Sequence, residues 1–120
     1  MKKQPISLIE NHHISIGYFA AQTGLSIRAL RLYDEVGLLK PAVVVKHNKY
    51  RYYKFEQIAV AQQIKTYREN ELPLEEIKLI LNHPLSAKEC LEQHLERLRQ
   101  RLTQHQTMIG QLEQMLHQTR

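Results

Sequence analysis

The sequence predicts a mainly α-helical chain in which short helices and a small β hairpin precede one long terminal helix. Three observations carry this prediction. A glycine-containing turn at residues 23–26 separates two short helical patterns, a β-branched and then aromatic segment occupies residues 43–53, and from residue 91 onward leucines recur with a heptad period. With 120 residues and 42% hydrophobic content, the chain can form one small core with an appended element.

Capping residues delimit the first two helices. Ser15 is a suitable N-cap for a helix over residues 16–23, on which Phe19 faces the core. Gly24 can supply the left-handed residue that ends this helix, and Ser26 can cap the next one. Two short helices around such a turn form a helix–turn–helix.

The second helix has an apolar side and a basic side. Ile27, Leu30 and Val36 lie at helical spacing toward the core, and the glycine after Val36 ends the helix. Arg28 and Arg31 share another side. Because arginine can bridge guanine edges or clamp phosphates, this pair predicts a helix that enters a DNA groove.

The hairpin, here called the wing, covers residues 43–53. Alternation along its second strand points Arg51 and Tyr53 to one face, and Tyr50 and Tyr52 to the other. Since one tyrosine pair has to be partly structural, we expect Tyr52 to face the core and Tyr53 to stay among the surface groups.

Two more helices follow the wing. The third is predicted over residues 55–69, with Ile58, Ala61 and Ile64 on its inner side. Pro73 suits the first turn of the fourth.

The last helix has the clearest pattern. Ser86 and Glu89 form an S-x-x-E capping box that starts a helix over residues 86–118, about 50 Å long. Eight seam positions alternate by four and three residues, and seven of them are apolar: Leu91, Leu95, Leu98, Leu102, His105, Ile109, Leu112 and Leu116. Nothing else in the chain can cover this seam, so we expect a two-stranded coiled coil with a second copy.

These parts resemble the DNA-binding domain of the MerR family of transcription regulators over residues 14–82. The matching segments are Ile14-Ser15-Ile16-Gly17, the run from Thr23 to Pro41, Tyr50-Arg51-Tyr52-Tyr53 and Leu74-Glu75-Glu76-Ile77. The resemblance implies a winged helix–turn–helix followed by a long antiparallel coiled-coil dimerisation helix over residues 86–118. Residues 1–13 are expected to form a flexible tail.

The resemblance also implies which residues face DNA. Arg28 is the candidate for reading bases, while Arg31 and Tyr33 are candidates for holding phosphates, with a core position as the alternative for Tyr33. Tyr50 and Arg51 of the wing would contact the DNA backbone. The complete predicted set is Ser26, Arg28, Arg31, Tyr33, Lys40, Lys49, Tyr50, Arg51 and Tyr53.

Three positions depart from the family pattern. Lys54 occupies the usual N-cap of the third helix, so that helix is expected to start less firmly. Lys49 replaces the usual wing glycine, so the shape of the wing is expected to differ from the family pattern. Glu71 replaces a glycine that often ends the third helix, and Asn70 is expected to take its role.

The positive charge lies in the first part of the chain. Residues 1–72 hold 11 Lys and Arg against 6 Asp and Glu, whereas residues 73–120 hold 6 of each, so the net charge of +5 resides with the helix–turn–helix and the wing. This distribution favours an anionic partner.

Cys90 is the single cysteine, which excludes an internal disulfide and fits a reducing compartment. With no run of about 18 apolar residues and no signal-peptide pattern, we expect a cytoplasmic protein without membrane association. Cys90 is either a passive thiol or a redox-sensing one. No catalytic arrangement of side chains is found, so we expect no enzyme.

The seven histidines do not predict a metal site or any cofactor. His12 and His13 fall in the expected tail, and His94, His105 and His117 are too far apart along one helix to share an ion. His105 occupies the seam, where it sets the coiled-coil register, is a tolerated irregularity, or senses pH.

The family resemblance implies a homodimer that binds a palindromic promoter and distorts double-stranded DNA so that RNA polymerase can use it. A competing interpretation is a helical protein-interaction adaptor that uses the coiled coil without specific DNA binding.

Overall fold

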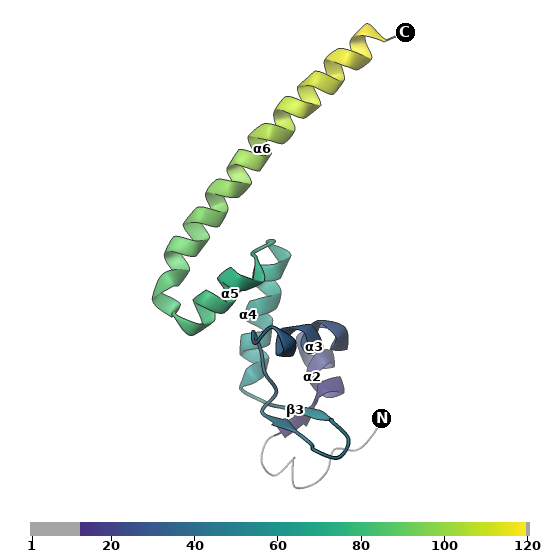
Figure 1. Cartoon of the computed structure of the whole chain (residues 1–120). Coiled ribbons are helices and arrows are strands. Elements are labelled where there is room, and N and C mark those ends of the chain that lie inside the picture. The colour runs from purple at the N-terminus through teal and green to yellow at the C-terminus, as the bar shows by residue number, and fades with distance from the viewer. Residues whose placement is uncertain (1–12, 120) are drawn as a thin grey trace. The chain divides into compact units, whose positions relative to one another are not determined.

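The computed structural model describes residues 13–119, which divide into two compact units at the boundary between Lys78 and Leu79. Figure 1 shows the elements in order. The first unit contains a small sheet and most of the helices; the second contains the long terminal helix. The mainly α winged helix–turn–helix predicted from the sequence is confirmed.

The sheet has three antiparallel strands in the order β1-β3-β2, with β1 spanning His13–Ser15, β2 Val43–Val44 and β3 Arg51–Lys54. Strand β3 is central: Tyr53 pairs with Ile14 of β1, and Tyr52 pairs with Val43 of β2. The hairpin is therefore confirmed, whereas β1 was not predicted. His13, which the sequence assigned to a tail, lies in this strand; the rest of that tail, residues 1–12, lies outside the described residues.

Helix α2 spans Ile16–Thr23 and α3 spans Ile27–Glu35. The hydroxyl oxygen of Ser15 accepts the Tyr18 N–H at 3.3 Å, and that of Ser26 accepts the Ala29 N–H at 3.0 Å. Gly24 between the helices has φ 75°. The predicted caps and turn are thus confirmed. Each serine accepts a backbone N–H that has no partner inside its helix, and the Gly24 N–H donates to the Ala20 carbonyl at 2.9 Å.

Helix α3 ends in a tight reversal. Gly37 takes φ 74°, and the N–H groups of Leu38 and Leu39 both donate to the carbonyl of Tyr33, at 2.8 and 3.1 Å. This reversal buries both leucines. It therefore fixes where the chain leaves α3 toward the wing.

The core-facing side of α3 differs partly from the prediction. Leu30 is fully buried, but Ile27 and Val36 are 39% and 40% exposed, so the core positions predicted for these two residues are wrong. They occupy the first turn and the C-cap of the helix, where fewer neighbours cover a side chain.

Helix α4 spans Gln57–Glu69, two residues later than predicted, and buries Ala61 and Ile64. Its N-cap has no side-chain hydrogen bond; instead the side-chain oxygen of Gln57 accepts the N–H of Lys54 at 2.8 Å. At the other end Glu71, not Asn70, takes the left-handed conformation, with φ 61°. The expectation that Asn70 fills this role is wrong.

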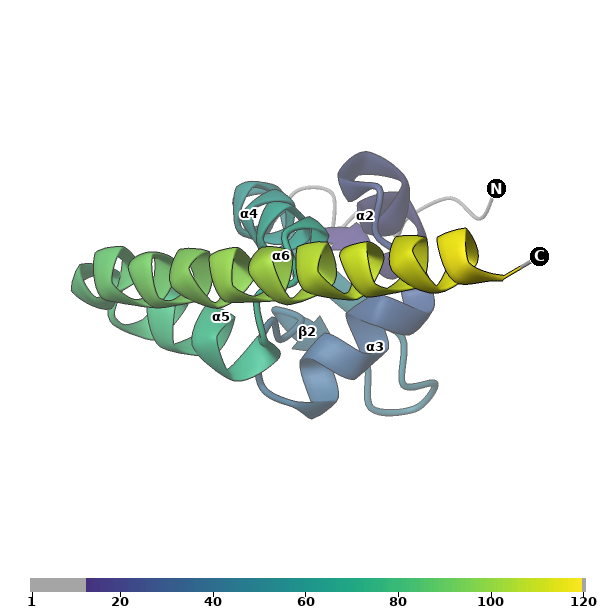
Figure 2. The ribbon, with the colours of Figure 1, turned by 90° about the horizontal axis from the view of Figure 1, so that it is seen from above.

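Helix α5 spans Leu74–Asn82, a short 3-10 helix η1 spans Pro84–Ser86, and α6 spans Ala87–Gln118. The predicted capping box does not form. Ser86 already has helical φ and ψ and donates its N–H to the His83 carbonyl at 2.8 Å, because η1 runs directly into α6. Figure 2 shows α6 as one uninterrupted helix.

The core of the first unit surrounds the central strand. The ring of Tyr53 stacks on that of Phe19 of α2. Among the residues that the structure describes, the largest fully buried side chains are Tyr53, Phe19, Leu30, Ile64, Leu72 and Ile77. No helix within residues 13–119 is long and apolar enough to span a bilayer.

Candidate nucleic-acid interface

The outer face of α3 is the most basic part of the helix–turn–helix. Arg28 and Arg31 are both exposed, and neither forms an ion pair with any residue of the range 13–119. A shallow surface around them includes Ile27 and Leu32, which are 39% and 44% exposed. Guanidinium groups beside apolar side chains match the mixture of guanine acceptors and thymine methyl groups in a major groove.

Ser26, by contrast, uses its hydroxyl for structure. The oxygen accepts the Ala29 N–H and so caps α3 while staying exposed beside Arg28. It therefore sets where the basic helix begins, and its own hydroxyl proton remains available to an acceptor.

Tyr33 is 6% exposed and lies on the buried side of α3 with Leu30. The structure therefore favours the core alternative for Tyr33 over the predicted phosphate contact. The backbone carbonyl of Tyr33 has a structural role too, because it accepts two N–H groups from the reversal after α3.

Tyr53 was predicted to face DNA, and this prediction is wrong, because the side chain is 0% exposed. Alternation along β3 does place Arg51 and Tyr53 on one face, but that face packs against the helices. Arg51 reaches α3 and Tyr53 stacks on Phe19 of α2. Tyr52 is buried as well, with 9% exposed, as expected.

The buried hydroxyl of Tyr53 has no hydrogen-bond partner within residues 13–119. Burial, the largest cause, and the negative charge of Asp34 raise the pKa of Tyr53 from its usual 10.0 to about 12, while the positive charge of Arg51 opposes this shift. The group therefore stays neutral at physiological pH.

The tip of the wing is ordered by local hydrogen bonds. The side-chain oxygen of Asn48 accepts the Tyr50 N–H at 3.0 Å, and the Val45 carbonyl accepts the Lys49 N–H at 2.8 Å. Lys49 adopts φ 61°, the left-handed conformation that the usual glycine would take without strain. Lys49 and Tyr50 are both exposed, so the tip presents a cation and a phenol to the solvent.

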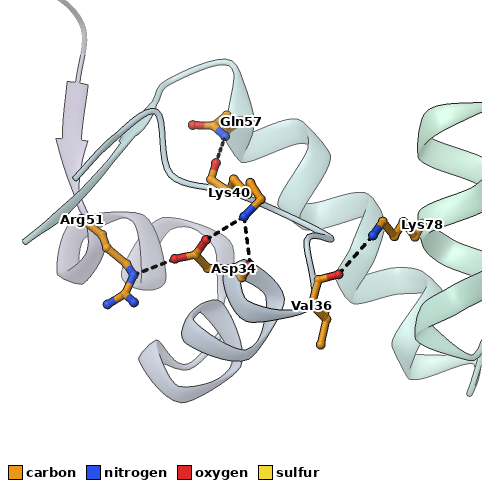
Figure 3. A network of polar contacts seen from close by, with 6 residues as sticks. All are labelled: Asp34, Val36, Lys40, Arg51, Gln57 and Lys78. Atoms are coloured by element: carbon orange, nitrogen blue, oxygen red, sulfur yellow. Dashed lines mark hydrogen bonds and ion pairs between the residues drawn. The ribbon is translucent and has the colours of Figure 1, made fainter. Parts of the chain in front are cut away.

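An acidic residue connects the wing to α3, as Figure 3 shows. The Nε of Arg51 donates to Oδ2 of Asp34 at 3.0 Å, and the Nζ of Lys40 lies 3.6 Å from Oδ1 of the same carboxylate. Lys40 also donates to the Asp34 carbonyl at 3.5 Å. The side chain of Asp34 is 18% exposed, against 27% for Arg51 and 69% for Lys40.

Asp34 is not among the residues that the sequence predicts at the DNA surface, because basic and aromatic side chains are the ones expected to face DNA. The residue lies within the matched motif, yet its partner Arg51 is 17 positions away and no local pattern joins the two. Only the fold brings them together.

The predicted seam of α6 lies exposed on the described chain. The apolar members Leu91, Leu95, Leu102, Ile109, Leu112 and Leu116 are 41% to 73% exposed, and Leu98 is partly covered. His105 is exposed too, with its Nδ1 2.6 Å from the Arg101 carbonyl oxygen. An exposed apolar stripe of this length is typical of a surface that associates with another chain.

Cys90 and His94 lie near the start of α6 and are buried, with 6% and 5% exposed. A terminal nitrogen of Arg97 lies 3.0 Å from the His94 Nδ1. In the part of the chain described here, no three His, Cys, Asp or Glu side chains gather as a metal site would require.

Comparisons with known proteins identify the family and the fold of this chain. The family model described as "MerR HTH family regulatory protein" matches residues 14–83. The transcriptional regulator BrlR of Pseudomonas aeruginosa is 32% identical over 86% of this chain, which spans 40% of BrlR.

Two solved structures are similar. The N-terminal part of Mta, the Bacillus subtilis multidrug transporter activator, aligns over 86% of this chain and 97% of its own, with TM-score 0.75 and 31% identity. EcmrR, solved in a DNA complex, aligns over 87% of this chain and 38% of its own with TM-score 0.78, and at 24% identity this likeness concerns the fold alone.

Proposed function

Since this chain belongs to the MerR HTH family of regulatory proteins, we propose that it binds a palindromic promoter element as a homodimer and controls transcription there. The observation that carries this proposal is the exposed basic face of α3, where Arg28 and Arg31 have no ion-pair partner within residues 13–119. Unpaired guanidinium groups on a recognition helix are available to bases and phosphates.

In this proposal residues 14–82 form the DNA-binding domain. Arg28 reads a base edge in the major groove, Arg31 contacts a phosphate, and the wing contacts the neighbouring backbone. The groups assigned to the DNA surface are Ser26, Arg28, Arg31, Lys40, Lys49, Tyr50 and Arg51. The net charge of +5 resides in residues 1–72 and supplies the attraction to phosphates.

Residues 86–118 form the dimerisation helix. The exposed seam would be covered by the same seam of an antiparallel second copy, which buries seven apolar side chains from each helix. The pairing sets the distance between two recognition helices, so the target is expected to be an inverted repeat.

Transcriptional control follows from deformation of the bound duplex. A dimer that contacts both half-sites can bend and untwist the DNA between them, with the deformation energy offset by the contacts it permits. RNA polymerase is then the functional partner, and the protein acts in the cytoplasm.

Selection of bound sequences from a random duplex pool tests the proposal. The expected result is an enriched inverted repeat, bound with an affinity that falls steeply between low and moderate salt. An adaptor that uses only its coiled coil would enrich no sequence and would show no preference for duplex. Either of these results would overturn the proposal.

A further inference from the structure

We propose that Asp34 is a positioning residue for DNA recognition, which fixes the wing and the following loop relative to α3. The inference rests on the proposed function and deepens it, since Asp34 itself need not touch DNA. Its carboxylate lies in the last turn of α3 and bonds two of the cations assigned to the DNA surface, Arg51 and Lys40.

The contact with Arg51 sets the direction of a planar group. The Nε of Arg51 donates to the Asp34 carboxylate at 3.0 Å, and Figure 3 shows the two terminal nitrogens of Arg51 pointing away from that carboxylate. Neither terminal nitrogen has a hydrogen-bond partner within residues 13–119. Because a guanidinium is rigid, fixing Nε aims both free donors in one direction, where they can bind a phosphate together.

The contacts with Lys40 fix the loop between α3 and the wing. Asp34 bonds Lys40 through both its carboxylate and its backbone carbonyl. The carbonyl of Lys40 in turn accepts from the side-chain nitrogen of Gln57 at 2.8 Å. The other end of the Gln57 amide accepts the N–H of Lys54 at the end of β3. A chain of bonds thus runs from α3 through the loop to the wing and α4.

The pair between Asp34 and Lys40 is too exposed to be explained by stability alone, whereas the pair with Arg51 is partly buried. Lys40 is 69% exposed, and an ion pair in such a place contributes little to folding. A carboxylate in this position also repels DNA phosphates. The Asp34 carboxylate therefore weakens the general attraction of the protein to DNA. In compensation, it holds Arg51 and Lys40 in a fixed orientation.

The inference predicts opposite effects on two kinds of binding. In Asp34→Asn, one negative charge is lost and both cations are held less firmly. The affinity for an unrelated duplex should stay constant or rise, while the affinity for the selected inverted repeat should fall. The ratio of the dissociation constant for the unrelated duplex to that for the repeat should fall by about five- to tenfold, because the backbone contacts that fix the register on the duplex are held less firmly.

Glu35→Gln is the matched control. Glu35 is the next residue of the same helix, is exposed, and forms no ion pair with the described part of the chain. Its loss removes the same charge, so both affinities should rise by a similar factor and their ratio should not change.

A double-mutant cycle identifies the route. If Asp34 acts through Arg51, Asp34→Asn should reduce the ratio of the two dissociation constants less in the Arg51→Ala background than in the wild-type background. Asp34→Glu keeps the charge but displaces the carboxylate by one methylene group. This variant tests the same positioning role if Asp34→Asn does not fold. It should lower the ratio without raising the affinity for the unrelated duplex.

Equal changes in both affinities for Asp34→Asn and Asp34→Glu would overturn the inference, since they would indicate a general effect on charge or fold. A wild-type chain that does not distinguish the two duplexes would instead overturn the proposed function. The two failures are therefore distinguishable in one set of titrations.

Discussion

The rings of Tyr53 and Phe19 lie parallel, with centroids 4.2 Å apart and an angle of 5° between their planes. This stack joins the central strand β3 to α2 and is completely buried. It supports the wing directly, because Tyr53 and the solvent-exposed Tyr50 belong to the same arm of the hairpin. Its one unfavourable feature is the Tyr53 hydroxyl, which has no partner within residues 13–119.

Replacing Tyr53 with phenylalanine is expected to stabilise the fold. The substitution keeps the stacked ring and removes a buried polar group without a hydrogen bond, which costs about 1–3 kcal/mol. We expect the urea midpoint to increase with an unchanged m-value. Tyr53→Leu, which removes the stack, should lower it. A lower midpoint for Tyr53→Phe would show that the hydroxyl is satisfied in solution.

The raised pKa of Tyr53 predicts a loss of stability at alkaline pH. The folded chain holds the phenol proton up to a pKa of about 12, whereas the unfolded chain releases it at its usual 10.0. This contribution is therefore fully present below pH 10 and is lost as pH rises toward 12. Unfolding free energies measured from pH 9 to 12 should fall more steeply for the wild type than for Tyr53→Phe. Parallel curves would contradict the assignment.

Glu71→Gly is expected to stabilise the end of α4. Glu71 has φ 61°, a conformation that costs a residue with a Cβ about 1–2 kcal/mol. Glycine avoids this strain but loses more entropy on folding, so a net gain of about 0.5–1 kcal/mol is expected. Thermal unfolding measures it. Glu69→Gly, at the last residue of α4, relieves no such strain and should destabilise the fold, and a loss of stability in both variants would refute the strain at Glu71.

The sequence predicted those features whose cause is local. Ser15 and Ser26 follow capping rules, and Gly24 supplies the positive φ that its own turn requires. At the end of α4 the sequence predicts Asn70 as the left-handed residue, because asparagine tolerates this conformation more easily than Glu71. In the structure the left-handed residue is Glu71; the N–H of Leu72, which follows it, donates to the Tyr67 carbonyl at 3.0 Å, and the Leu72 side chain is buried.

Features that depend on distant partners could not be predicted in this way. Strand β1 is recognisable only through its pairing with β3. Alternation grouped Tyr53 with Arg51 but did not say which face the helices cover. The bond between Asp34 and Arg51 likewise exists only after the wing has folded onto α3.

The seam of α6 leads to a prediction about dimer strength. His105 is the polar member among eight seam positions, so His105→Leu should strengthen a homodimer by about 1 kcal/mol or more through added apolar burial. Sedimentation equilibrium measures the dimer dissociation constant. His117→Leu, on the same helix but off the seam, is the control and should not change it. A weaker dimer in His105→Leu would indicate that the imidazole makes a bond across the interface.

Arg28 and Arg31 are expected to have separable effects on DNA binding. Arg28→Ala should relax sequence preference at one base position of each half-site by about 1–3 kcal/mol, because a base edge loses its donor. Arg31→Ala should weaken binding to all duplexes alike and lower the slope of log affinity against log salt by about 1 for each protomer, because a phosphate contact is lost. Competition with single-base variants of the selected repeat, repeated at several salt concentrations, distinguishes the two. If both variants lost affinity uniformly, Arg28 would be a phosphate contact, and base reading would have to come from other groups on the outer face of α3.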